Sequence, residues 1–129
     1  MTLLETNIKN GLVGIEKDGE RIVNLCPHSI NILSPFKNGD IVTIPQSGAI
    51  ARVDHNRSDI EKHAGFPITR EVYGEVYGLP DAVDGTIYIV SAPVVNVLND
   101  SRHDVITVGK QMKDEYGKSV AAISFRRQF

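Results

Sequence analysis

The chain has 129 residues, of which 41% are hydrophobic and 23% charged, and its formal net charge is -2 at pH 7. This length fits a single domain, 1–129, with one core. A nearly neutral chain has no global attraction to nucleic acid or lipid, so duplex nucleic acid and membranes are not expected partners. Cys26 is the only cysteine, which excludes an intrachain disulfide and a cysteine-based zinc site. The start lacks a signal-peptide pattern and no run reaches membrane-spanning length, so we expect a cytoplasmic protein.

Turn signals divide the first half of the chain into short extended segments. Asp18-Gly19 predicts a hairpin, because both residues tolerate the positive φ of tight turns, and Asn38-Gly39 predicts a second one. Residues 1–20 are expected to supply an added N-terminal strand or an oligomerisation arm. The predicted strands of this half are residues 11–16, 21–25, 30–33, 41–44 and 49–53.

The middle of the chain changes from polar to extended. Residues 54–65 are almost entirely polar without an amphipathic period, and we interpret them as a surface loop. Residues 66–77 read as extended, and Glu-Val-Tyr-Gly occurs twice in succession over 71–78. With a period of two, Val72, Gly74 and Val76 are expected on one face and Tyr73, Glu75 and Tyr77 on the other, and the glycines indicate a bulge or a close backbone approach.

The second half predicts one helix among strands. Residues 86–91 form the most continuous apolar strand and are expected at the centre of the sheet. Ser91 followed by Pro93 predicts the start of a short helix over about 92–99. A strand within 101–108 and a closing hairpin with its turn at Gly117 complete the chain. The predicted fold is α+β and mainly β, with antiparallel meander and hairpins forming a small sheet or barrel-like domain.

Two side chains are the best candidates for chemistry. His28 follows Pro27 at a strand junction, where a fixed imidazole suits phosphate binding or proton transfer. Arg52 interrupts an apolar strand and suits a phosphate clamp. Ser29 and Ser47 with Gly48 can offer hydroxyl and backbone N–H donors to an anion. The alternatives are that His28 bonds a backbone carbonyl, that the serines stabilise turns, and that Arg52 is a surface residue.

Other residues extend this predicted site. Tyr73 and Tyr88 can stack on a base or ribose, although packing explains them equally well. Arg102 and Asp104 add charge, with local pairing as the alternative. His55 and His63 lack converging ligands, so no metal is expected, and no cofactor motif occurs. The complete set of candidate ligand-binding residues is His28, Ser29, Ser47, Gly48, Arg52, Tyr73, Tyr88, Ser91, Arg102 and Asp104, with His28 catalytic only if the protein is hydrolytic.

Five phrases occur in an order that resembles a family of small proteins of phages, prophages and some bacterial genomes. The resemblance covers about Ile22 to Phe125, with Cys26 where the family has threonine and Gly109 where it has proline. The phrases are VNLCPH (23–28), PQSGAIARV (45–53), YGEVYGLP (73–80), GTIYIVS (85–91) and RHDV (102–105).

This resemblance implies a phage-type origin. By analogy with small oligomeric phage proteins of the anti-Thoeris and anti-CBASS type, we expect a homo-oligomeric counter-defence protein in the host cytoplasm. Its expected activity is to bind and sequester a nucleotide immune signal, such as a cyclic dinucleotide or an ADP-ribose derivative. The alternatives are a metal-independent phosphodiesterase that cleaves such a signal, with His28 as general base, and a virion, assembly or other protein-interaction module.

Overall fold

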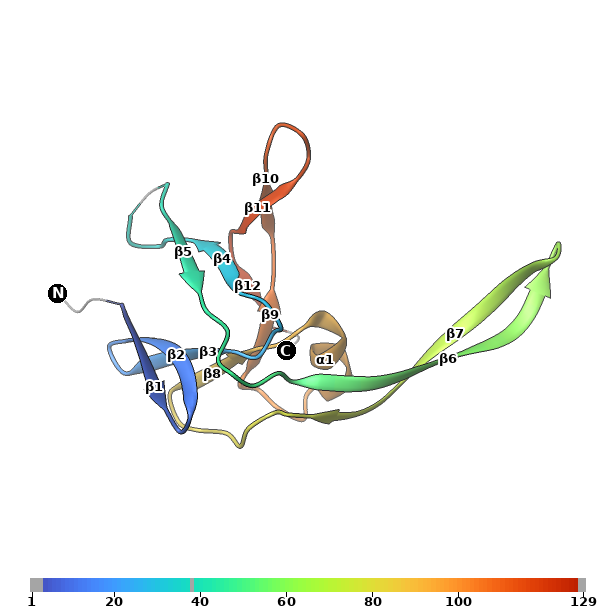
Figure 1. Ribbon diagram of the computed structural model, residues 1–129, viewed down its shortest axis with the longest axis horizontal. Helices are drawn as coiled ribbons and strands as arrows, with labels where there is room; N and C mark the ends of the chain where they lie inside the picture. Colours follow the sequence, from blue (N-terminus) through green and yellow to red (C-terminus); the bar gives the residue numbers. More distant parts are fainter. Residues whose placement is uncertain (1–3, 38, 128–129) are drawn as a thin grey trace.

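The structure is a computed structural model that describes residues 4–37 and 39–127. A mixed six-stranded sheet lies at the centre of the body (Figure 1). The central pairs are parallel and the outer pairs antiparallel. In spatial order its strands are β1 (Glu5–Lys9), β2 (Leu12–Lys17), β3 (Glu20–Asn24), β8 (Thr86–Ile89), β9 (Val105–Val108) and β12 (Phe125–Arg126).

Two further sheets and a helix complete the fold. The helix α1 (Ala92–Leu98) connects the parallel strands β8 and β9, which need a crossover longer than a hairpin turn. A four-stranded sheet has the order β10 (Gln111–Lys113), β11 (Ser119–Ala122), β4 (Ile30–Leu33), β5 (Ile41–Ile44). The third sheet is a hairpin of β6 (Arg52–His63) and β7 (Phe66–Tyr77).

The central strand β8 is buried on both faces. Tyr88 belongs to a cluster that includes Val94 and Val95 of α1. Ile89, which points to the opposite face, belongs to a second cluster that includes Ile30 of β4 and residues of β5 and β9. The helix therefore covers one face of the six-stranded sheet, and the four-stranded sheet covers the other.

The β6–β7 hairpin, which we call the hairpin arm, projects away from this body (Figure 1). Each strand has twelve residues, so the arm is about 40 Å long at the usual rise per residue. Val53 and Val76, at its base, are half-buried, and the other residues of its two strands are exposed. The turn at its tip uses Ala64 and Gly65, both with positive φ, as a two-residue hairpin turn requires.

The mainly β class with a short helix is confirmed. Within the described ranges, α1 is the single helix, and it covers 92–98 as the Ser91 and Pro93 signals predict. Strand β8 lies within its sheet, and the β2–β3 hairpin turns at Asp18 and Gly19 with φ of 53° and 81°. The N-terminal segment adds β1 and β2 to one edge of the sheet, whereas its oligomerisation role stays a prediction. Asn38 lies outside the described residues.

Several local predictions are wrong. The segment 54–65 is not a loop, because 54–63 continue β6. The sheets are not purely antiparallel, since β3–β8, β8–β9 and β11–β4 pair in parallel, and they stay open rather than closing into a barrel. Residues 49–51 precede β6 rather than forming part of a strand.

A register shift also changes the faces of β7. Val76 and Tyr73 pair with two residues of β6 that are two positions apart. Residues two positions apart on a strand share a face, and so do their partners on the neighbouring strand. Val76 therefore lies with Tyr73, not with Val72 as expected from simple alternation. The shift occurs beside Gly74, where a bulge or close approach is predicted, and an added Cβ there would lie 3.2 Å from the Cβ of Asp54.

No helix among the described residues is long and apolar enough to cross a membrane, since α1 has only seven residues.

The exit from the hairpin arm requires glycine. Gly78 has φ +81°, and an added Cβ would overlap the carbonyl oxygen of Ile50. Gly117 has a similar φ of +78° but nothing within 4 Å of an added Cβ. We predict that Gly117→Ala costs about 1–2 kcal/mol of unfolding free energy, from positive φ alone. Gly78→Ala should cost a further ~1–3 kcal/mol because of the overlap. Urea denaturation of both variants measures this difference, and equal losses would contradict it.

Candidate functional site

A buried amide fixes the turn that contains His28. Asn24, at the end of β3, is fully buried. Its side-chain oxygen accepts a hydrogen bond from the Cys26 N–H at 2.9 Å, and its Nδ2 donates to the carbonyl oxygens of His28 at 2.9 Å and Ile44 at 3.3 Å. One side chain thus closes the turn after β3 and joins it to the end of β5.

Backbone hydrogen bonds then bring three segments to the same place. The Leu25 N–H donates to the Ile89 carbonyl at 2.9 Å, and the Ala51 N–H donates to the Leu25 carbonyl at 3.1 Å. The Ser47 N–H donates to the Asn24 carbonyl at 3.0 Å. The phrases VNLCPH, PQSGAIARV and GTIYIVS are therefore neighbours in the fold, and Arg52 follows directly from this junction.

A shallow pocket of about 520 Å³ lies at the junction, and we call it the arm-base pocket. It brings together Arg52, Tyr73 and Ser91 from the predicted site. Pro27 contributes from the turn after β3 and Pro93 from α1. Its complete lining is Pro27, Ile50, Ala51, Arg52, Val53, His55, Tyr73, Ser91 and Pro93.

The polar groups of the arm-base pocket differ in how they are held. Arg52 is exposed and, within the described part of the chain, its guanidinium forms neither a hydrogen bond nor an ion pair. Ser91 precedes α1 without a side-chain capping bond. The rings of His55 and Tyr73 form a tilted pair with centroids 5.9 Å apart. A cation, a hydroxyl and two rings therefore remain available to a ligand.

A surface network orients Tyr73. Its hydroxyl donates to Glu71 at 3.0 Å, and Glu71 also accepts a hydrogen bond from Arg57. The bonds from Arg57 and from Tyr73 hold the pKa of the Glu71 carboxyl below its ordinary value, and hydrogen bonding to Glu71 raises the pKa of Tyr73. Tyr73 is thus held as a neutral hydrogen-bond donor, with its ring directed by the partner of its hydroxyl.

The other predicted residues near this junction do not line the arm-base pocket, and the side chains of His28 and Ser47 have local partners. His28 is exposed and does not line the arm-base pocket, and its Nδ1–H donates to the carbonyl oxygen of Ser29 at 3.0 Å. Ser29 is also exposed. Ser47 is buried, and its hydroxyl donates to the Ala49 carbonyl at 3.1 Å and accepts from the Ala49 N–H at 3.3 Å. Gly48 has φ +101° in the same turn.

Arg102 and Asp104 form a two-bond ion pair outside the arm-base pocket. Arg102 Nε and Nη2 donate to the Asp104 carboxylate at 2.8 and 2.7 Å, and Nη2 also donates to the Pro80 carbonyl at 2.9 Å. The pair connects the start of β9 to the segment after the hairpin arm. The hydrogen-bond donors of Arg102 are therefore occupied by the protein itself, which agrees with the alternative that Arg102 and Asp104 form a local pair.

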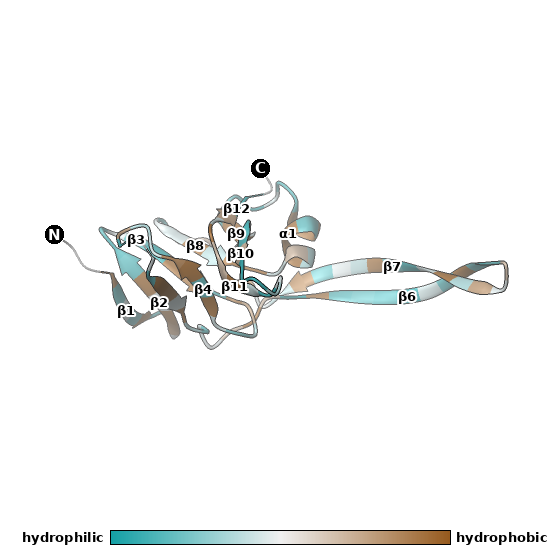
Figure 2. Cartoon of the chain, turned by 90° about the horizontal axis from the view of Figure 1, so that it is seen from above, coloured by the Kyte–Doolittle hydropathy of each residue, from teal (hydrophilic) through white to brown (hydrophobic). Residues whose placement is uncertain are grey.

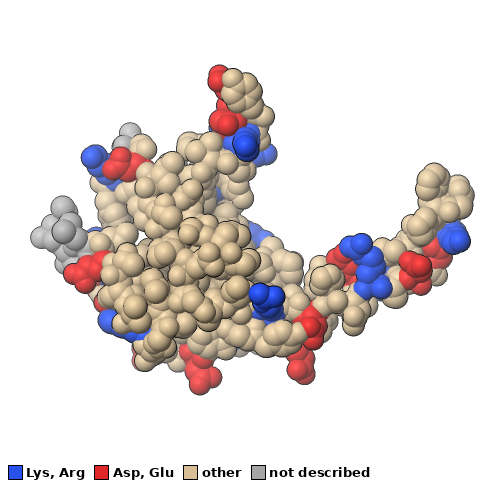
Figure 3. All heavy atoms as spheres, viewed as in Figure 1, with Lys and Arg blue, Asp and Glu red and all other residues tan. Residues whose placement is uncertain are grey.

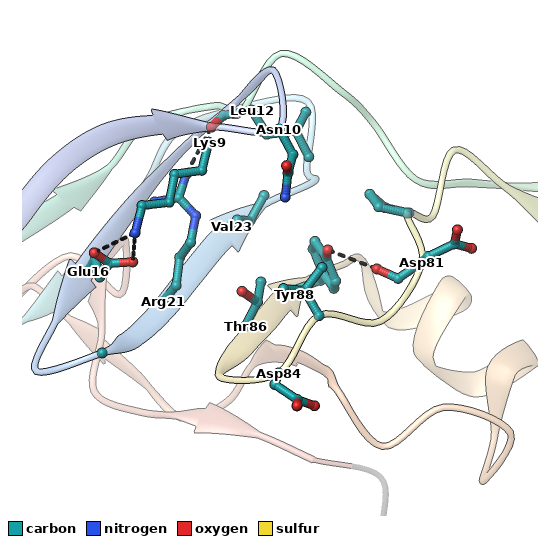
Figure 4. A pocket seen from close by; sticks show the side chains of 13 residues that line it. Lys9, Asn10, Leu12, Glu16, Arg21, Val23, Asp81, Asp84, Thr86 and Tyr88 are labelled. Carbon is teal, nitrogen blue, oxygen red and sulfur yellow. Dashed lines mark hydrogen bonds and ion pairs between the residues drawn. The ribbon is translucent and has the colours of Figure 1, made fainter.

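Tyr88 lines a different cavity, the polar pocket of about 480 Å³ (Figure 4). Its hydroxyl donates to the Asp81 carbonyl at 3.2 Å. Lys9 in this pocket is paired with Glu16 at 2.7 Å, and the buried Arg21 donates to the Leu12 carbonyl at 2.9 Å. The cations of the polar pocket are therefore satisfied.

A third cavity, the intersheet cleft, is the most apolar. It has a volume of about 710 Å³ between the six-stranded and the four-stranded sheets. Aliphatic and aromatic side chains dominate its lining, which includes Ile15, Ile22, Ile32, Val42, Ile44, Ile87, Ile123 and Phe125.

Sequence reasoning missed one residue of the candidate site and one buried cation. His55 joins Tyr73 in the arm-base pocket, which only the β6–β7 register reveals, because the polar sequence of 54–65 predicts a surface loop. Arg21 is 6% exposed and lies against Gly14 of β2. A Cβ added at Gly14 would lie 2.8 Å from Arg21 Cζ, so the glycine leaves room for the guanidinium. Gly14 within a strand was the available signal. Across the described ranges no group of three or more His, Cys, Asp or Glu could hold a metal ion.

Comparisons with protein-family models, with curated proteins and with solved structures gave no match. The resemblance to small phage proteins therefore stays a prediction.

The Arg102–Asp104 pair predicts a pH dependence of stability. The Arg102 hydrogen bonds hold the pKa of the Asp104 carboxyl below its ordinary value, against the opposing effect of burial. Because the folded state favours the carboxylate, this stabilisation is complete above ~pH 4 and is lost as the pH falls through the lowered pKa. Asp104→Asn should lower the unfolding free energy by about 1–2 kcal/mol at neutral pH, and by progressively less below ~pH 4.

Urea denaturation of the native protein and of Asp104→Asn across this pH range measures the effect. Asp100→Asn, at an exposed carboxylate after α1, is the control and should leave the curve unchanged. A deficit for Asp104→Asn that stays constant with pH would contradict the ion-pair account.

Proposed function

We propose that the protein captures a small phosphate-bearing ligand of the nucleotide class in the arm-base pocket. The observation that carries this proposal is Arg52, a guanidinium without a protein partner among the described residues, beside an aromatic pair and a hydroxyl. Arginine binds phosphate through charge-assisted hydrogen bonds, and a ring such as Tyr73 can stack on a base or ribose. Ser91 offers one more hydrogen bond at the same pocket.

Electrostatics favours this pocket over the other two. Arg52 and His55 line it, whereas no carboxylate stands among its described lining residues. The polar pocket contains Asp81 and Asp84, and its cations are already bonded. The intersheet cleft is mainly apolar. A phosphate therefore meets an uncompensated positive charge at the arm-base pocket and repulsion at the polar pocket.

The same arrangement favours capture over cleavage. The hydrolytic alternative requires His28 as a base beside the phosphate, and His28 does not line the arm-base pocket. We therefore keep sequestration of a nucleotide signal, such as a cyclic dinucleotide or an ADP-ribose derivative, as the proposed counter-defence activity.

Thermal-shift measurements and titration calorimetry with a cyclic dinucleotide, ADP-ribose and inorganic phosphate test the proposal. One of the nucleotides should raise the melting temperature, because a ligand that binds only the folded state stabilises it. Arg52→Ala removes a charge-assisted contact of about 1.5–3 kcal/mol, which corresponds to a loss of affinity of roughly 10- to 100-fold. The bound ligand should be recovered intact after heat denaturation.

Arg70→Ala is the matched control, since Arg70 is an exposed arginine of the same hairpin arm that does not line the pocket. It should bind as the native protein does. Equal affinity of Arg52→Ala and the native protein, or no binding of either nucleotide, would overturn the proposal. Cleaved products that disappear in His28→Ala would replace capture by hydrolysis.

A further inference from the structure

The hairpin arm has one polar face and one face on which apolar and polar side chains are mixed. Arg57, Glu71 and Tyr73 are bonded to one another on the first face. Arg70 and the β6 residues Asn56, Glu61 and His63 share the second face with three apolar side chains of β7. These three are Val72, Ile68 and Phe66. They are 53%, 38% and 73% exposed. Figure 2 shows the apolar segments that interrupt the polar ribbon toward its far end.

An arm of this kind is incomplete by itself. A two-stranded ribbon is marginally stable in water unless a further strand or another apolar surface packs against it. Nearly all of its 24 residues, twelve from each strand, are exposed. One side of a stable protein interface uses about 20–30 residues, so the arm alone is large enough to form such a side.

The same chain carries a complementary surface at its other end. The intersheet cleft is lined by residues of the β2–β3 turn and of the β4–β5 hairpin, which lie on the opposite side of the body from the tip of the arm (Figure 1). Two large apolar side chains of this cleft are exposed, Phe36 by 60% and Ile123 by 43%. Because the arm points away from the body, it cannot reach the cleft of its own chain.

We propose that the apolar tip of the hairpin arm, centred on Phe66 and Ile68, inserts into the intersheet cleft of a second copy of this chain. Phe66 and Ile68 are exposed at the tip, and apolar side chains dominate the cleft, although Lys17, Asp18 and Glu20 line its β2–β3 side. Burying apolar side chains contributes about 1.5–3 kcal/mol each. An interface between two different surfaces of one chain is head-to-tail, so repetition produces a closed ring or a filament. This inference is independent of the phosphate pocket.

The charge pattern favours a protein partner for the arm. Lys and Arg alternate with Asp and Glu along it rather than forming a patch of one sign (Figure 3). Nucleic acids and anionic lipid surfaces require a positive patch. A second copy supplies an apolar receptor of about 710 Å³ at the same concentration as the arm itself.

Size-exclusion chromatography with light scattering tests the assembly. The native chain should have a mass of at least two copies. Phe66→Asp at the tip and Phe36→Asp at the cleft should each be monomeric, because each places a charge in the apolar contact. Tyr116→Asp is the control, since Tyr116 is an 86% exposed aromatic residue that lines none of the three cavities, and it should assemble as the native chain does.

Mixing the two monomeric variants identifies the geometry. Phe66→Asp retains an intact cleft and Phe36→Asp retains an intact tip, so the mixture should form a complex with one copy of each. Association between two arms instead predicts that Phe36→Asp assembles normally and that the mixture gives no such complex. Either of these results, or a monomeric native chain, would overturn the proposal.

Engineered disulfides give an independent readout that keeps the surfaces apolar. The native Cys26 is buried, which raises its pKa to about 11 and keeps it unreactive as a background. Phe66→Cys combined with Phe36→Cys should form disulfide-linked chains on oxidation, whereas Phe66→Cys alone should not. Cross-linking of Phe66→Cys alone would show tip-to-tip contact and contradict the head-to-tail arrangement.

Discussion

The buried carboxamide of Asn24 is the interaction on which the rest of the junction depends. It satisfies three backbone groups that lie on two separate segments, and water cannot replace it at a fully buried position. The turn that Asn24 closes contains Pro27. The neighbouring segment, which is bonded to the backbone of this turn, leads to Arg52. Together with the backbone hydrogen bonds of Ser47 and Ala51, the Asn24 side chain holds the two sides of the arm-base pocket in register.

The hairpin arm and the body have different physical roles. Two hydrophobic clusters on opposite faces of the central sheet stabilise the body. The arm contributes few buried contacts beyond Val53 and Val76 at its base, and its outer half exposes apolar side chains. A two-stranded ribbon is marginally stable in water, and the proposed assembly would cover the apolar side chains near its tip.

Much of the body could be predicted because its signals are local. Asp18-Gly19 specifies a turn by its backbone preferences, and Ser91 with Pro93 specifies a helix start. The continuous apolar run 86–91 predicts a strand at the centre of the sheet, and β8 lies between β3 and β9. Parallel pairing of β3 with β8 joins residues more than sixty positions apart, and no local pattern encodes that choice.

The arm and the site were harder to predict. Strand β6 is exposed on both faces, so it lacks the alternation of apolar and polar residues by which strands are recognised. His55 could not be assigned to the pocket without the register that places it opposite Tyr73. Among the residues expected to share a site, Arg52, Tyr73 and Ser91 lie together, while His28 and Tyr88 lie outside their pocket.

Amide hydrogen exchange in the native protein and in Asn24→Asp tests the central role of Asn24 most directly. The aspartate has nearly the same shape but lacks the two donors that reach His28 and Ile44. Protection should fall at the amides of Cys26, Ser47 and Ala51, with little change in the β10–β11 hairpin. Unchanged protection at those three amides would contradict the claim that this buried side chain holds the junction together.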